Sequence, residues 1–334
     1  MSKPQGGSSG IDQTGQGDSK TQKPKFNPFA NPAPELLIAQ VPSRSDENSK
    51  YSHALILNKF PVINNHVIIA TKDNKSQTAV LEQDDLSMTY ACLRAWSDEQ
   101  RQQQQIQRQG PNPKRLFSFF NSGEHSGASQ PHRHLQFLPV EDMQGKGKET
   151  ENEPCELLID RMTVPAHPDL PLYQDPALPM LHFATPLEEG EAVSAAALHS
   201  KYLMLLKAAI SASQQPREAF TSSSVSSLSV QDNDGNAVIS YNFAMTTERM
   251  AICPRRKEGA GIWGAGADSF VAVNGTILGG SLMVKDEAEW DLLRRDSSAL
   301  EALLGELCFP SVSWLGMEMG MGMGMDPDAN AARL

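Results

Sequence analysis

The sequence predicts an α+β fold built on an antiparallel β-sheet with flanking helices. Three observations support this prediction: short apolar runs rich in β-branched residues occur in blocks, amphipathic helical segments occur in other blocks, and the two kinds do not alternate regularly. A regular alternation would instead predict a parallel sheet. The 334 residues, of which 39% are hydrophobic, suffice for one large domain or two ordinary ones.

The N-terminal half contains several predicted strands and one helix. Pro61 and the pair Asn64-Asn65 separate the first two apolar runs, which indicates a strand, a connection and a second strand. The helix is indicated by apolar residues at helical spacing and by Asp84 and Asp85 in its first turn. The predicted strands are residues 54–58, 66–70, 116–120 and 135–138, and the helix carries Leu86, Tyr90, Leu93 and Trp96.

The C-terminal half combines polar connections with further strands and helices. Residues 145–179 are polar and rich in proline, which is typical of a surface insertion or linker. Residues 221–229 are rich in serine, which is typical of a flexible connector. The other predicted elements are a helix at 191–213, strands at 238–245, 250–253 and 278–284, and helices at 288–295 and 298–307.

Charge and composition exclude several kinds of partner. The formal net charge of −11 disfavours an extended nucleic-acid interface but permits a small anionic ligand held by aimed donors. No apolar run reaches the roughly 18 residues of a membrane helix, and the polar N-terminus lacks the apolar region of a signal peptide. The four cysteines form no Cys-x-x-Cys pair, so a reducing compartment and no zinc site are expected. We expect a cytoplasmic protein, with the nucleus as a second location.

The segment between the third and fourth predicted strands is suited to binding phosphate. Residues 121–130 are rich in Gly, Ser and Ala, so their backbone N–H groups can turn toward one point and hold phosphate oxygens. The segment leads directly into the run His132-Arg133-His134-Leu135-Gln136. Alternate residues of a strand share one face. One face should therefore carry His132, His134 and Gln136, and the other face Arg133, Leu135 and Phe137.

A neutral imidazole beside a phosphate cradle suits covalent nucleotidyl transfer. It can attack phosphorus, form a phosphoramidate, and then be displaced by a second phosphate. His134 is the predicted nucleophile, and its other ring nitrogen should donate its proton to an acceptor such as a backbone carbonyl. Gln136 can donate to a phosphoryl oxygen as charge develops, and His132 completes the catalytic group. Two alternatives remain for the histidine pair: metal ligation, or a purely structural place in the sheet.

The strand resembles that of the histidine triad (HIT) superfamily, in which His-x-His-x-Gln marks the nucleotidyltransferase branch. Further motifs resemble the fungal diadenosine tetraphosphate phosphorylase (ATP adenylyltransferase) family, from about Lys23 to Pro310. These motifs are Leu57-Asn58-Lys59-Phe60-Pro61-Val62, Asn121-Ser122-Gly123, Ser126-Gly127-Ala128-Ser129, Ser240-Tyr241-Asn242 with Thr246, Pro254-Arg255, and Asn274 with Gly279-Gly280 and Lys285.

The resemblance implies a HIT-like antiparallel sheet that a C-terminal segment completes. Composition predicts disordered tails at residues 1–22 and 315–334, and the resemblance suggests the domains between them. Residues 23–140 form the HIT-like catalytic part with His-x-His-x-Gln, residues 141–180 an insertion or linker, and residues 181–314 the C-terminal ATP adenylyltransferase domain.

The resemblance also implies an activity, the cleavage of diadenosine tetraphosphate by inorganic phosphate into ATP and ADP through adenylylated His134. The reaction would be reversible, and adenylyl sulfate would be a second adenylyl donor. We expect Mg²⁺ to arrive with the polyphosphate, no dedicated metal ligands, and a monomer. The substrate-binding residues implied are Lys23, Asn58, Lys59, Asn121, Ser122, Gly127, Ala128, Ser129, Gln130, Asn274, Gly275, Thr276, Ser281 and Lys285.

Two other functions stay open at this point. Hexose-1-phosphate uridylyltransferases share the His-x-His-x-Gln strand, but they usually have proline between the histidines and a Cys-x-x-Cys zinc site. This chain has Arg133 there and no such cysteine pair. The other function is a nucleotide-binding sensor without turnover, suggested by two departures from the family: Glu124-His125 inside the phosphate loop, and Arg249 at a position where a tryptophan is usual.

Overall fold

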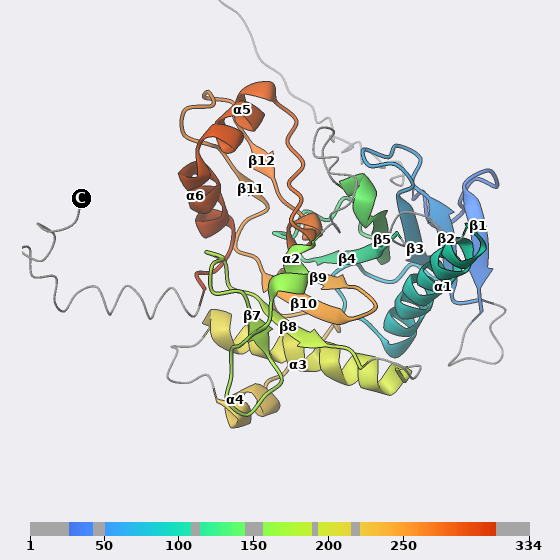
Figure 1. Ribbon diagram of the computed structural model, residues 1–334. Coiled ribbons are helices and arrows are strands. Elements are labelled where there is room, and N and C mark those ends of the chain that lie inside the picture. The colour runs from blue at the N-terminus through green and yellow to red at the C-terminus, as the bar shows by residue number, and fades with distance from the viewer. Residues whose placement is uncertain are drawn as a thin grey trace, which may run out of the picture.

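The computed structural model describes residues 27–42, 51–107, 114–143, 156–188, 193–214 and 221–311 (Figure 1). Lys23 and both predicted tails, at 1–22 and 315–334, lie outside the described residues. A ten-stranded sheet in the order β1-β2-β3-β5-β4-β9-β10-β8-β7-β6 forms its centre. The strands are β1 (Leu37–Val41), β2 (His53–Leu57), β3 (Val67–Thr71), β4 (Leu116–Ser122), β5 (His134–Pro139), β6 (Val164–Pro165), β7 (Tyr173–Gln174), β8 (Phe183–Pro186), β9 (Tyr241–Met245) and β10 (Arg249–Pro254).

Helices and a small second sheet surround this large sheet. A two-stranded sheet of β11 and β12 lies with α5 and α6 in one lobe (Figure 1). Its strands are β11 (Gly259–Ala260) and β12 (Val271–Ala272). The helices are α1 (Gln83–Gln107), α2 (Leu158–Arg161), α3 (Ala195–Gln214), α4 (Ser222–Ser227), α5 (Glu287–Arg295) and α6 (Ser297–Leu307), with the 3-10 helices η1 (Val140–Met143) and η3 (Gly275–Gly279).

The large sheet joins the two halves of the chain. Strand β4 pairs with β5 on one side and with β9 on the other, where Ser118 faces Met245 and Ser122 faces Tyr241. Every strand pair recorded in this sheet is antiparallel. The α+β prediction is therefore confirmed, including the completion of the sheet by C-terminal strands.

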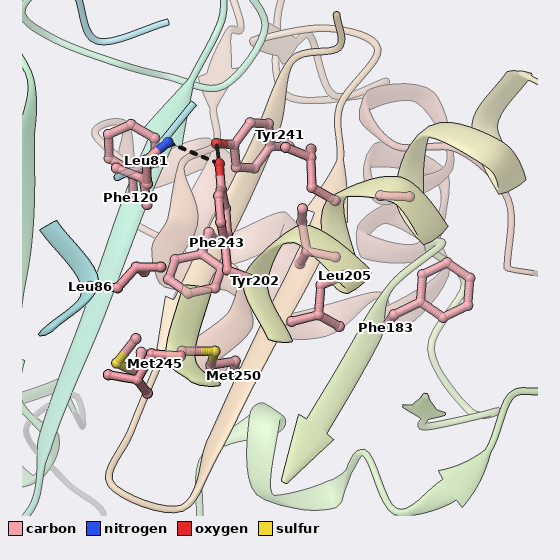
Figure 2. Packing of buried hydrophobic residues seen from close by; sticks show 14 of the residues in the cluster. Leu81, Leu86, Phe120, Phe183, Tyr202, Leu205, Tyr241, Phe243, Met245 and Met250 are labelled. Carbon is pink, nitrogen blue, oxygen red and sulfur yellow. Dashed lines mark hydrogen bonds between the residues drawn. The ribbon is translucent and has the colours of Figure 1, made fainter. Parts of the chain in front are cut away.

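Helices α1 and α3 cover one face of the sheet. Leu86 of α1 and Tyr202 of α3 are fully buried in one cluster with Tyr241 of β9. Figure 2 shows two hydrogen bonds in this cluster: the Leu81 N–H donates to the Tyr202 hydroxyl at 3.2 Å, and the Tyr202 and Tyr241 hydroxyls lie 2.6 Å apart. The pair ties α3 both to the sheet and to the segment that leads into α1. Burial of an apolar neighbour such as Leu86 contributes roughly 1.5–3 kcal/mol.

The opposite face packs against the C-terminal part of the chain. Phe119 of β4 is buried here with Ile277 and Leu278 of η3 and Leu303 of α6. The next residue, Phe120, belongs to the cluster under α1 and α3. This alternation along β4 is the period-2 pattern of a strand buried on both faces. It brings η3 over the face of the sheet on which His134 is expected.

The predicted strand at 278–284 is wrong. Residues 275–279 form the 3-10 helix η3 instead, because the Asn274 side chain accepts from the Thr276 N–H and caps its start. Gly280 ends it with φ of 83°, a left-handed conformation that favours glycine. Residues 281–286 belong to no strand or helix. In an apolar run this short, periodicity alone cannot distinguish a buried strand from a buried helical turn.

Three other segments differ from their predictions. Strand β9 begins at Tyr241 rather than at 238, and the serine-rich stretch contains the short helix α4. The described part of the predicted surface insertion, residues 156–179, contributes the buried side chains Leu157, Ile159 and Met162. These apolar residues lie among prolines and charges, so the average polarity of the segment hides them. None of the described helices is long and apolar enough to cross a membrane.

Candidate active site

The histidine strand has the two-faced pattern that the sequence predicts. Leu135 and Phe137 are buried under α1 and α3. The His132 and His134 rings lie on the other face, where both contact the Phe29 ring, with centroid distances of 5.8 and 4.8 Å. His134 is the first residue of β5 and pairs with Ala70 of β3.

His134 has the protonation state that a nucleophile requires. Its Nδ1 lies 2.8 Å from the His132 carbonyl oxygen. A carbonyl only accepts, so Nδ1 carries the proton and Nε2 keeps its lone pair. This confirms the predicted carbonyl acceptor. Burial lowers the pKa of His134 from 6.5 to about 4, although the His132 carbonyl acts in the opposite direction. The ring is therefore neutral near pH 7, and no described residue forms a hydrogen bond with Nε2.

His132 has both ring nitrogens engaged by the protein. Nε2 donates to the Thr71 carbonyl at 2.7 Å, and Nδ1 accepts from the Asn27 amide at 2.9 Å. Its ring is thus committed to holding the chain in place, and its carbonyl orients His134. The predicted catalytic role of His132 stays a prediction, and the contacts assign it an orienting contribution through the backbone.

Arg133 fills the opposite face with a buried ion pair. Its guanidinium lies 2.7 Å from the Asp85 carboxylate, whose other oxygen lies 3.0 Å from Nε2 of His53. All three side chains are buried. Burial would raise the pKa of Asp85, but His53 and Arg133 together hold it below its usual value. The Arg133 N–H also donates to the Lys75 carbonyl at 2.8 Å, a bond that a proline in its place could not form.

The glycine-rich loop after β4 is folded by its own backbone. Gly123 and Gly127 have φ of 90° and 76°, which favour glycine, and Ser126 donates to the Gly123 carbonyl at 2.7 Å. The Asn242 amide donates to the Ser126 carbonyl at 2.8 Å. Glu124, at the tip of the loop, is exposed. Its carboxylate therefore points into solvent, which weakens the argument for a sensor without turnover.

The C-terminal residues implied in substrate binding lie against this loop. The Gly275 N–H donates to the Asn121 side-chain oxygen at 2.8 Å, and the Asn242 amide donates to the same oxygen at 2.9 Å. A Cβ on Gly127 would lie 2.7 Å from the Val273 carbonyl. The Thr276 hydroxyl donates to the Ser281 carbonyl at 2.8 Å, which closes the turn. The fold thus unites residues 121–127 and 273–281 in one place.

Asn58, which the family resemblance implies in substrate binding, reaches the same face through His66. The Asn58 amide donates to Nδ1 of His66 at 3.0 Å. Nε2 of His66 is buried and, among the described residues, lies near the Gln136 side chain without a hydrogen bond of good geometry. Burial lowers the pKa of His66, while the neighbouring Gln136 side chain acts in the opposite direction. His66 in turn helps to lower the pKa of His134. Asn58, His66, Gln136 and His134 are therefore neighbours.

The other predicted site residues have fewer described contacts with the group around His134. Lys59 and Lys285 are exposed, and no described contact links either lysine to His134. The Ser122 hydroxyl donates to the Thr78 carbonyl at 3.4 Å, on the flank of the loop. Ala128, Ser129 and Gln130 complete the loop on the way to Pro131 and are partly or fully exposed. The described residues contain no cluster of three or more His, Cys, Asp or Glu that could hold a metal ion.

Sequence reasoning missed several supporting side chains. Gln77 bonds to the backbone of both Asn121 and His134. Arg255, which is 2% exposed, donates to the Asn242 side chain at 2.6 Å and to the Val273 carbonyl at 2.9 Å. Asn242 and Arg255 belong to the motifs quoted for the family, but Gln77 carries no signal in a single sequence.

Comparisons with known proteins agree with this geometry. The model of the Ap4A phosphorylase N-terminal domain matches residues 10–99 and 112–160, and that of the ATP adenylyltransferase C-terminal domain matches residues 176–310. Two proteins of Saccharomyces cerevisiae are similar along most of their length. Diadenosine tetraphosphate phosphorylase 2 is 27% identical over 89% of this chain and 79% of its own, and protein APA1 is 26% identical over 86% and 77%.

Solved structures give the same result. The crystal structure of the yeast Ap4A phosphorylase Apa2 superposes with a TM-score of 0.62 at 25% identity, over 86% of this chain and 82% of its own. The same enzyme in complex with Ap4A gives a TM-score of 0.59 at 25% identity, over 85% and 81%. Two adjoining family models cover both halves of the chain, and the fold agrees. The chain therefore belongs to the Ap4A phosphorylase (ATP adenylyltransferase) family of HIT-like nucleotidyltransferases.

Proposed function

We propose that the protein cleaves diadenosine tetraphosphate with inorganic phosphate, giving ATP and ADP. The observation that carries the proposal is the state of His134: Nδ1 is held by a carbonyl at 2.8 Å, burial lowers the pKa to about 4, and Nε2 keeps its lone pair. The Gln77 amide links the His134 backbone to that of Asn121, just before the glycine-rich loop. A buried neutral imidazole at such a loop is the arrangement that nucleophilic attack on phosphorus requires.

In the first step, Nε2 attacks the phosphorus next to one adenosine. A phosphorus–nitrogen bond forms, the bond from that phosphorus to the bridging oxygen breaks, and ATP leaves with the electron pair. Nδ1 keeps its proton, so the imidazole carries a positive charge in the adduct. The His132 carbonyl accepts the bond from Nδ1 at 2.8 Å and stabilises that charge.

In the second step, an oxygen of inorganic phosphate attacks the adenylyl phosphorus. The phosphorus–nitrogen bond breaks, ADP forms, and His134 returns to its neutral state. Each step passes an adenylyl group between an imidazole and a phosphate, so the sequence runs in reverse when ATP and ADP are supplied. Adenylyl sulfate should donate the same group with sulfate as the leaving group.

The chain supplies several candidate binding groups for these steps. The Gln136 amide lies on the His134 face and can donate to a non-bridging oxygen as charge develops. The backbone of residues 123–130 can bind the polyphosphate. Lys59 and Lys285, both exposed, supply mobile positive charge. Mg²⁺ would arrive bound to the polyphosphate and neutralise part of its charge. We expect the enzyme to act as a monomer in the cytoplasm, with the nucleus as a second location.

The test uses Ap4A labelled with ³²P at the phosphorus next to adenosine. Wild type should form an acid-labile adduct without phosphate, and should release labelled ADP when phosphate is added. His134→Ala should form neither. His182→Ala is the matched control, because His182 is also buried with Nδ1 2.8 Å from a carbonyl, that of Met180. The control should lose stability but still form the adduct.

Each other outcome has a definite meaning. Release of AMP and ATP independent of phosphate would contradict phosphorolysis and indicate hydrolysis. Tight binding of Ap4A without adduct or products would favour the sensor. Turnover by His134→Ala would refute the assignment of the nucleophile.

A further inference from the structure

One buried side chain occupies a gap in the sheet beside His134. The β4–β5 ladder runs from Leu116 opposite Pro139 to Phe119 opposite Gln136. The same register, continued by two residues, would bring Asn121 opposite His134. The recorded ladder stops before that pair. Strands β4 and β5 therefore separate where the loop of residues 122–130 leaves β4 and where the nucleophile begins β5.

The Gln77 amide bonds to both strands across this gap. Nε2 donates to the Asn121 carbonyl at 2.9 Å and to the His134 carbonyl at 3.2 Å. Oε1 accepts from the His134 N–H at 2.8 Å. A primary amide has one acceptor oxygen and two N–H donors, so Gln77 replaces the peptide groups that a continued ladder would supply. Its side chain is only 2% exposed.

The segment that carries Gln77 is itself fixed against the histidine run. The Gln77 N–H donates to the Pro131 carbonyl, and the Arg133 N–H donates to the Lys75 carbonyl, both at 2.8 Å. Ser76 and His132 form an isolated β-bridge. The Gln77 side chain therefore starts from a defined backbone position and has little freedom to move.

We propose that Gln77 is a positioning residue that sets the distance between Nε2 of His134 and the phosphate loop. The His134 ring is fixed to its own backbone through Nδ1 and the His132 carbonyl, so the backbone of His134 determines where Nε2 lies. Asn121 lies in β4 just before the loop, and Gln77 bonds to the backbone of both Asn121 and His134. This inference rests on the proposed function, because it concerns the geometry of the same attack. A displacement near 1 Å costs about 100-fold in rate.

The first test is Gln77→Met, which keeps the length of the side chain but loses all three hydrogen bonds. We expect kcat and the single-turnover rate of adduct formation to fall about 100-fold, with KM changed less than about threefold. Gln174→Met is the matched control. Gln174 is also buried, but it lies on β7, which β9, β10 and β8 separate from β4. The control should lower Tm without lowering the adduct rate.

The second test, Gln77→Glu, remains informative if the methionine variant does not fold. A carboxylate still accepts from the His134 N–H, but its other oxygen faces two carbonyls and must be protonated to donate. The ratio of variant to wild-type adduct rate should therefore rise as pH falls from 8 to 5.5. A ratio independent of pH would overturn the proposal, as would a methionine variant with wild-type adduct rate and lowered Tm. If wild type forms no adduct in these assays, the proposed function fails before Gln77 is tested.

Discussion

The depressed pKa of His134 should be visible in the pH dependence of adduct formation. Burial is the main cause of the shift from 6.5 to about 4. A base that titrates at 4 is about 90% neutral at pH 5, whereas an unperturbed histidine is roughly 3% neutral at that pH. The rate of adduct formation should therefore be nearly constant from pH 8 to 5. With an unperturbed histidine as nucleophile, the rate of adduct formation would fall about 30-fold over the same pH range.

The assay is rapid mixing of the enzyme with labelled Ap4A in the absence of phosphate. Leaving out phosphate isolates the first step, so the ionisation of inorganic phosphate does not enter the profile. The reaction is stopped in alkali because the phosphorus–nitrogen adduct is acid-labile. Pulse unfolding at each pH confirms that the enzyme is folded. An acid limb centred near pH 6.5 would refute the burial argument.

A substitution at Phe29 tests the physical cause. The Phe29 ring is buried with its centroid 4.8 Å from that of His134, so Phe29→Ala admits water to the imidazole. Hydration favours the charged form, and the pKa of His134 should rise by about one unit. The acid limb of the variant should move to higher pH by that amount. An unchanged limb would show that desolvation by this ring is not the cause.

Two further predictions follow from contacts around the site. In Gly275→Ala, the added Cβ would lie 2.9 Å from the Asn121 side-chain oxygen, so the turn must shift. The KM for Ap4A should rise at least about 10-fold, and unfolding in urea should show a loss of about 1–3 kcal/mol in stability. An unchanged KM would contradict this prediction. Asp85→Asn should cost about 3 kcal/mol at pH 7 because Arg133 loses its buried partner. The pKa of Asp85 in the folded protein lies below its unfolded value, which is near 3.9. The difference in unfolding free energy between wild type and variant should therefore shrink as pH falls below about 4. A difference in unfolding free energy that is independent of pH would refute the ion-pair argument.

The sequence alone determined the position of the strand that carries His134 and the polarity of its two faces. His132, His134 and Gln136 alternate with Leu135 and Phe137, and period-2 alternation is a local property that any strand must display. The neighbouring glycines predicted a loop by their conformational freedom. The helices α1, α3, α5 and α6 were predicted within a few residues, because helical periodicity is also a local property.

Only the tertiary structure decided which polar groups support that strand. Residues 278–284 appear strand-like in sequence. Their first two residues instead end the 3-10 helix η3, which the Asn274 cap starts and which is buried against the sheet. Gln77 and Arg133 are polar residues whose partners lie tens of positions away in the chain. Burial by distant parts of the chain also lowers the pKa of His134, whose ring contacts that of Phe29. Periodicity reports which residues are buried, whereas hydrogen-bond partners and desolvation depend on which elements meet in space, and no local pattern encodes that meeting.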